Sequence, residues 1–175
     1  MKKFELTNEF ITNMFGTKLF RIRALVEFGD VEAGELGGYV EKESNLGHDD
    51  NAWVYDNAWV YGNARVYGDA QVSGDARVYG NAWVYGNALV CSDEDYAYAH
   101  GFGSVNRTTT FFRLKDGGVG VRCGCFYGTL AQFRDKIRET HGETKKAQEY
   151  LMLADLMELR FEEDENEVGN RKYVE

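Results

Sequence analysis

Residues 51–92 consist of seven consecutive six-residue units, NAWVYD, NAWVYG, NARVYG, DAQVSG, DARVYG, NAWVYG and NALVCS. In every unit an alanine and a valine stand two positions apart, so both lie on one side of an extended strand and the residue between them points to the other side. An Asn or Asp opens each unit and most units end in glycine, which is typical of tight turns. A short strand and a turn every six residues, with small and branched apolar side chains inward, predict a parallel β-helix.

The repeat is similar to the hexapeptide repeat of left-handed β-helices, in which three units form one triangular coil of about 18 residues. Upstream of it, two pairs of residues keep the same two-residue spacing, Gly38 with Val40 and Ser44 with Leu46. Residues 47–50 are expected to form a two-residue bulge before the regular units start. We therefore predict a mainly β chain with a left-handed parallel β-helix of about three coils over residues 38–92.

The ends of such a solenoid expose apolar side chains and unpaired backbone, so the flanking segments are expected to cap it. Residues 3–6 and 19–28 alternate in the manner of strands. They predict an N-terminal β-hairpin cap over residues 1–37, with its turn at Gly16 and Thr17.

Residues 93–161 predict a second module, made of a β-hairpin and two helices. The hairpin is expected over residues 107–126, around an Asp-Gly-Gly turn. A capping-box sequence that starts at Thr129 predicts a helix over residues 130–140. An apolar stripe at helical spacing predicts a second helix over residues 145–161.

The charge balance and the cysteines restrict the class of protein. The chain carries 20 Lys and Arg against 29 Asp and Glu, and its formal net charge of −9 argues against nucleic-acid binding. Residues 162–175 form an acidic tail, which is expected to be solvated and flexible.

No apolar run approaches the ~18 residues that a membrane span requires, and no signal peptide is visible. The three cysteines suit neither a disulfide framework nor a zinc site, so we expect a cytoplasmic protein without a bound metal.

The period of the repeat also sorts its outward-facing residues into three faces. All three tryptophans, Trp53, Trp59 and Trp83, point outward in this arrangement. Aromatic rings with arginines between them could bind a planar ligand by stacking and cation–π contacts. Coverage by the chain's own caps or by neighbouring subunits is the favoured interpretation of these faces. The candidate ligand-binding or partner-binding residues are Trp59, Tyr61, Arg65, Tyr67, Arg77, Tyr79, Trp83 and Tyr85.

Motifs outside the repeat point to a family. The leader GELGGYVEKESNL at residues 34–46 precedes the NAxVYG units, and the C-terminal module contains TTTFF (108–112), CGCF (123–126), GTL (128–130) and THG (140–142). In these motifs nearly the whole chain resembles a recurrent group of phage and bacterial hexapeptide-repeat proteins. The resemblance implies a left-handed β-helix with a recurring C-terminal module, in proteins often labelled as transferases or as hypothetical. It implies no established reaction, so no catalytic residue is carried over from it.

The favoured function is that of a non-enzymatic scaffold or binding protein without a cofactor. Cyclic assembly of three copies would bury one aromatic face of each subunit, so we expect a homo-oligomer, most simply a trimer. In the phage setting that the resemblance suggests, such an assembly would bind a host protein or sequester a small, nucleotide-like ligand in the clefts between subunits.

The alternative function is acyl transfer from coenzyme A. The repeat is similar to that of hexapeptide acyltransferases, which act as trimers with a histidine as general base. His48 and His100 are the candidate bases. A pair formed by Cys123 or Cys125 with His141 is a weaker alternative, since no acid nearby would orient the histidine. The repeat itself contains no histidine and no long inserted loop, so we favour the non-enzymatic function.

Overall fold

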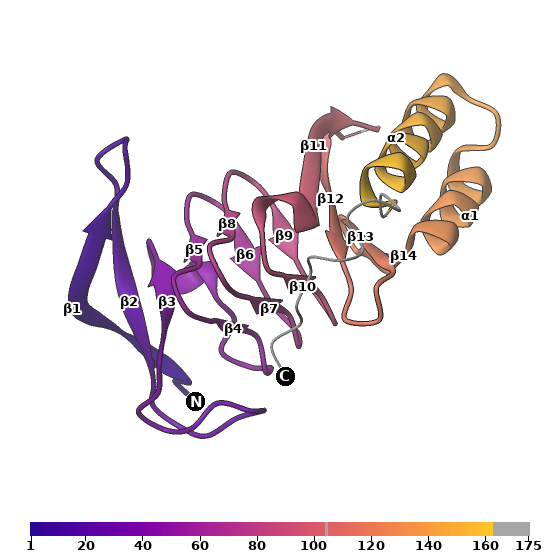
Figure 1. Ribbon diagram of the computed structural model, residues 1–175. Coiled ribbons are helices and arrows are strands. Elements are labelled where there is room, and N and C mark those ends of the chain that lie inside the picture. Colours follow the sequence, from indigo (N-terminus) through magenta and orange to yellow (C-terminus); the bar gives the residue numbers. More distant parts are fainter. Residues whose placement is uncertain (104, 163–175) are drawn as a thin grey trace.

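The computed structural model describes residues 1–103 and 105–162, and its central part is a solenoid of short parallel strands (Figure 1). Each six-residue unit contributes one strand of two residues: β4 (Trp53–Val54), β5 (Trp59–Val60), β6 (Arg65–Val66), β7 (Gln71–Val72), β8 (Arg77–Val78), β9 (Trp83–Val84) and β10 (Leu89–Val90). Strands 18 residues apart pair in parallel, which produces the ladders β4–β7–β10, β5–β8 and β6–β9. The prediction of a mainly β chain with short, stacked parallel strands is confirmed.

The interior of the solenoid consists of one alanine and one valine from each unit. All of them are fully buried: Ala52, Val54, Ala58, Val60, Ala64, Val66, Ala70, Val72, Ala76, Val78, Ala82, Val84, Ala88 and Val90. Glycines turn the chain between units. At Gly68 the backbone φ is +72°, and an added Cβ would lie 2.8 Å from the backbone nitrogen of Gly86 in the next coil. The coils therefore stack so closely at this corner that only glycine fits.

The N-terminal cap extends one side of the solenoid by three strands. β1 (Phe4–Thr12) pairs antiparallel with β2 (Lys18–Ala24), β2 pairs antiparallel with β3 (Leu36–Val40), and β3 joins β5 in parallel. The second strand ends at Ala24, whereas the sequence predicted a strand to residue 28. It ends there because the chain turns back and pairs Phe28 with Val31 across a tight turn.

The coil that precedes the regular units departs from the predicted spacing. Ser44 is exposed, whereas Asn45 is fully buried at the end of a short 3-10 helix, η1 (Glu43–Asn45). The Asn45 side-chain amide donates hydrogen bonds to the carbonyl oxygens of Gly62 and Ala64, at 3.2 and 2.8 Å. In the regular ladders a backbone N–H supplies the donor to such a carbonyl. Here the side chain of a polar residue supplies it instead, which the two-residue spacing did not reveal.

The C-terminal module is a four-stranded antiparallel sheet with two helices packed on it. The strands run in the order β11 (Tyr96–Phe102), β12 (Arg107–Arg113), β13 (Val119–Cys123) and β14 (Phe126–Thr129). The predicted hairpin is thus only the centre of the sheet. The polar break after the repeat is a short 3-10 helix, η2 (Asp93–Asp95), that leads directly into β11, and a turn at Gly124 divides the second expected strand into β13 and β14.

Both predicted helices are present, as α1 (Leu130–His141) and α2 (Lys145–Phe161). The capping box is formed, because the Thr129 hydroxyl accepts the backbone N–H of Gln132 at 3.3 Å and the Gln132 side chain accepts the N–H of Thr129 at 2.9 Å. Among residues 1–103 and 105–162, no helix is both long and apolar enough to span a membrane. The predicted acidic tail lies outside the described residues, apart from Glu162.

Strand β12 joins the module to the solenoid. Phe112 packs into the solenoid core, whereas its neighbour Phe111 packs into the core of the module. The backbone N–H of Trp83 donates to the Thr110 hydroxyl at 2.9 Å. The four-stranded sheet therefore covers one end of the solenoid, and the N-terminal strands lie at the other end (Figure 1).

Candidate anion-binding groove

A groove of about 580 Å³ lies where the β6–β9 face of the solenoid meets the C-terminal sheet. Its walls come from three parts of the chain: the segment around η1, two neighbouring coils of the solenoid, and the strands β11, β12 and β13 with the turn that follows. The lining residues are Lys42, Ser44, Asn63, Ala64, Arg65, Asn81, Trp83, His100, Arg107, Thr108, Arg122 and Gly124.

The solenoid contributes a cation–aromatic pair to the groove. Arg65 and Trp83 are direct partners in the β6–β9 ladder, so both point outward at the same height of neighbouring coils. The Arg65 guanidinium lies 5.3 Å from the centre of the Trp83 ring. Arg122 on β13 approaches the same ring at 5.8 Å and the ring of Tyr85 at 4.9 Å. The indole therefore holds two guanidinium groups at one edge of the groove through cation–π contacts.

The C-terminal sheet contributes the opposite wall. His100 and Thr108 are cross-strand partners on β11 and β12, and the His100 Nδ1 atom lies 2.8 Å from the Thr108 hydroxyl oxygen. The Arg107 guanidinium lies directly against the backbone of Gly124, in space that any side chain at that position would occupy. Gly124 thus makes room for Arg107 at the mouth of the groove.

The lining of the groove is positively charged although the chain is acidic. Lys42, Arg65, Arg107 and Arg122 line it, and no Asp or Glu of residues 1–103 and 105–162 does. Within residues 1–103 and 105–162, none of these four side chains forms an ion pair. The Nε atom of Arg122 is buried and has no hydrogen-bond partner in that same part of the chain. Guanidinium groups with free donors are suited to bidentate contacts with phosphate or carboxylate.

The structure divides the eight predicted binding residues between two faces. Arg65 and Trp83 line the groove, Tyr85 borders it beneath Arg122, and Tyr67 is half-buried against Gly47. The other four lie on the neighbouring ladder, where Arg77 lies 4.6 Å from the Trp59 ring centre and Tyr61 stacks on Tyr79 at 5.3 Å.

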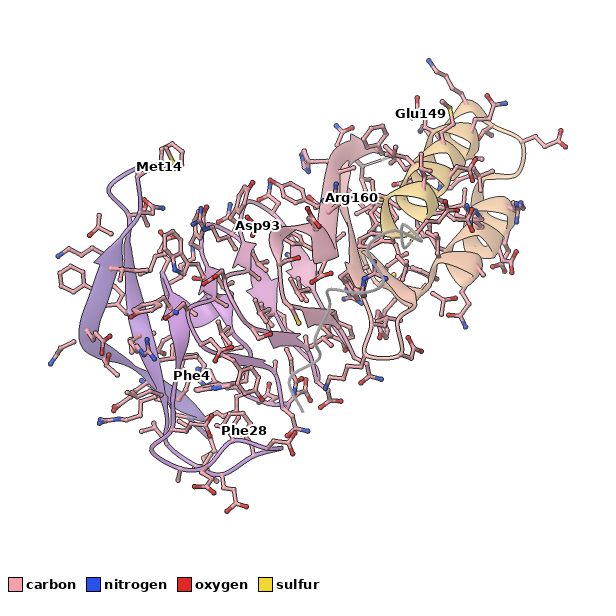
Figure 2. All side chains as sticks on the ribbon, in the orientation of Figure 1. Phe4, Met14, Phe28, Asp93, Glu149 and Arg160 are labelled. Atoms are coloured by element: carbon pink, nitrogen blue, oxygen red, sulfur yellow. The ribbon has the colours of Figure 1, made fainter. Side chains whose placement is uncertain are left out.

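Trp53 is fully buried, although its position in the repeat predicted an outward side chain. It does point away from the solenoid core, but the N-terminal cap covers it. The rings of Phe28 and Phe4 pack edge-on against it, at 5.3 and 6.2 Å between centres, and Figure 2 shows both on the cap. The favoured interpretation, coverage by the chain's own cap, holds for this tryptophan.

The two candidate bases lie in different places. His100 lines the groove, whereas His48 packs in the N-terminal cap, where its ring stacks on Phe4 at 4.4 Å and its Nδ1 accepts the backbone N–H of Lys3 at 3.2 Å. Burial lowers the pKa of His48. These contacts give His48 a role in packing the cap, away from the groove.

The cysteine–histidine pair is not formed. The Tyr150 ring stacks on His141 at 5.9 Å, while its hydroxyl lies 3.9 Å from the Cys123 sulfur, so Tyr150 stands between the two. Burial raises the pKa of Tyr150 to about 12. Cys125 is exposed in the turn after β13. In the part of the chain that the structure describes, no three His, Cys, Asp or Glu side chains gather in a way that would hold a metal ion.

Sequence reasoning missed Lys42, Arg107 and Arg122. Lys42 lies in the irregular first coil, next to η1, whereas Arg107 and Arg122 lie in the C-terminal module, and only the packing of the module brings them to the repeat. The one available signal was the presence of arginines at both ends of the predicted hairpin in an otherwise acidic chain.

Comparison with known proteins bears on the solenoid alone. A family model described as the YdcK beta solenoid repeat matches residues 58–74 and 70–86, two overlapping copies within the repeat. No curated protein matches the chain. Over residues 58–86 the chain is therefore similar to the YdcK beta solenoid repeat.

Proposed function

We propose that this chain is a non-enzymatic binding protein and that its groove binds a small, phosphorylated, nucleotide-like ligand. We further propose that the solenoid is left-handed, as its hexapeptide pattern predicts. The observation that carries the proposal is the lining of the groove, in which three arginines and a lysine meet with no acidic residue from the described part of the chain, although the net charge is −9.

The chemistry of the groove favours a phosphorylated ligand over an apolar one. Arg65 and Arg122 have their guanidinium planes fixed on Trp83, so their N–H groups are oriented before a ligand arrives. A volume of about 580 Å³ suits a mononucleotide or dinucleotide. A base would lie against a guanidinium plane or the exposed part of Trp83, since flat π-systems stack on both. Asn63 and Asn81 add polar groups that would fix its orientation.

The groove is built by one chain, whereas the sequence placed the ligand between subunits. A trimer is thus not required for the proposed binding. It stays a prediction, and the face with Trp59, Tyr61, Arg77 and Tyr79 is the aromatic surface available for it. Binding to a host protein also stays a prediction.

The proposal is tested by titrating the protein with AMP, ADP and ATP, and with adenosine as the uncharged control. Binding is measured by isothermal titration calorimetry, because tryptophan fluorescence would mix the signal of Trp83 in the groove with that of the half-buried Trp59 outside it. Arg65→Gln and Arg122→Gln are expected to weaken nucleotide binding by at least tenfold each, since each removes a charged donor. Arg77→Gln is the matched control, because Arg77 stacks on Trp59 in the same way outside the groove.

Nucleotide binding that weakens with salt and is lost in both groove variants would support the proposal. Equal loss in Arg77→Gln, or absence of binding to any phosphorylated compound of the series at millimolar concentration, would refute it.

Acyl transfer from coenzyme A is the second candidate, because His100 lies in the same groove and coenzyme A carries phosphates. The Thr108 hydroxyl, 2.8 Å from Nδ1, would orient the ring and leave Nε2 to act as the base. The two candidates differ in one variant. His100→Gln would abolish acyl transfer from acetyl-coenzyme A if the protein is an enzyme, whereas it would leave nucleotide affinity within about threefold if the groove only binds.

A further inference from the structure

Helix α2 exposes a continuous apolar stripe on the side that faces away from the module. Met152, Leu156 and Leu159 are 71, 54 and 67% exposed. Their spacing of four and three residues places them on one face of the helix. The opposite face, with Ala147, Tyr150, Ala154, Met157 and Phe161, is buried in the module core. The helix therefore has two apolar faces, of which the module covers one.

We infer that this stripe binds the same stripe of a second copy of the chain, with the two α2 helices antiparallel. An apolar stripe with its own charged flank is the pattern of a helix that pairs with another helix. The inference does not depend on the groove.

The charges beside the stripe identify the partner and the orientation. Glu149 and Arg160 lie 11 residues apart, about three helical turns, so they flank the stripe on the same side. Figure 2 shows them near opposite ends of α2. Neither has an ion-pair partner in the described part of the chain. Antiparallel pairing about a two-fold axis sets the same flank of both helices together, so it places Glu149 beside Arg160 of the partner subunit twice, whereas parallel pairing sets opposite flanks together and forms neither contact.

The apolar contacts favour nearly the same register as the charges. A two-fold axis that places Met152 opposite Leu159 of the partner subunit passes between residues 155 and 156. The axis that pairs Glu149 with Arg160 of the partner subunit passes between residues 154 and 155, one residue away. This offset of one residue, about 1.5 Å along the helix, is small enough for the long side chains of Glu149 and Arg160 to span, so one two-fold axis serves both sets of contacts.

The other flank of the stripe does not oppose this pairing. Asp155 lies near the two-fold axis, where it approaches Asp155 of the partner subunit. Arg134 on α1 already binds Asp155 at 2.8 Å and Glu158 at 2.8 Å, which neutralises much of that charge. Arg134 is only 16% exposed, so this pairing is held in place by the packing of the module.

The test is sedimentation velocity of the full chain over a concentration series, with Leu156→Glu as the disrupting variant. We expect reversible self-association that Leu156→Glu weakens by at least tenfold, because a carboxylate would enter the apolar contact. Met14→Glu is the matched control, since Met14 is 90% exposed at the tip of the β1–β2 hairpin and far from α2 (Figure 2). A trimer formed by a solenoid face would keep its stoichiometry in both variants.

Charge exchange tests the orientation. Glu149→Arg and Arg160→Glu should each weaken association several-fold, and the double exchange should restore it. A chain that is monomeric at every concentration, or self-association that Leu156→Glu leaves unchanged, would refute the inference. A double exchange no stronger than either single variant would refute the antiparallel pairing.

Discussion

Asn45 gives the sharpest test of how the first coil is attached to the regular solenoid. Its side chain is fully buried, donates to the carbonyl oxygens of Gly62 and Ala64, and accepts the backbone N–H of Lys42 at 2.9 Å. Asn45→Ala would remove all three hydrogen bonds and leave their backbone partners without them. A net hydrogen bond contributes about 1 kcal/mol, and a buried group left unsatisfied costs about 1–3 kcal/mol. We therefore expect the free energy of unfolding to fall by about 2–4 kcal/mol.

Urea denaturation followed by circular dichroism measures this loss as a lower midpoint at an unchanged slope. Ser44→Ala is the matched control, because the neighbouring Ser44 is exposed, and its effect should stay within ~0.5 kcal/mol. Asn45→Asp keeps the acceptor for Lys42 but faces two carbonyl oxygens with a carboxylate, so it should cost at least as much as alanine. A loss below ~0.5 kcal/mol in Asn45→Ala would show that these hydrogen bonds do not hold the coil.

Two further changes test the corner and the cap of the solenoid. Gly68→Ala should lower the free energy of unfolding by about 2–4 kcal/mol, because its Cβ would contact Gly86 and the backbone φ is positive there. Gly16 is the matched control, since its φ is also positive, at +82°, but no atom lies near it, so Gly16→Ala should cost about 1 kcal/mol. Thermal melts of the two variants measure this difference. The buried Lys3 ammonium, which donates to two backbone carbonyls, has a pKa lowered to about 8 by loss of solvation, so the folded state binds its proton less tightly than the unfolded state. The free energy of unfolding should therefore rise as pH increases from about 8 to about 10.5. Measured against Lys3→Met, the wild type should gain about 2 kcal/mol between pH 7 and pH 9.5. A difference between the two proteins that does not change with pH would contradict this.

The repeat shows how far local sequence reaches. Alanine and valine recur every six residues, and this period determines which side chains form the core. The pairing of strands three units apart followed from the resemblance of the repeat to that of left-handed β-helices. The capping box at Thr129 likewise marks the start of α1 from four consecutive residues. These features were predictable because the contacts that create them lie within one unit or one helical turn.

The surface of the repeat was not predictable in the same way. Trp53, Trp59 and Trp83 occupy the same position in three NAWVY units, yet Trp53 is fully buried and Trp83 is 37% exposed. The difference lies in Phe4 and Phe28, which reach Trp53 from outside the repeat. The burial of an outward residue depends on which flanking segment folds over it, and no period within the repeat contains that information.

The sequence by itself determined the solenoid, its core and the two C-terminal helices, since each follows from spacing along a short stretch of chain. Only the tertiary structure decided where the candidate site lies. Arg65 comes from the repeat, while Arg107 and Arg122 come from strands whose register places them beside it. Four cations meet in one groove because segments more than forty residues apart pack together, and such long-range packing leaves no periodic trace in the sequence.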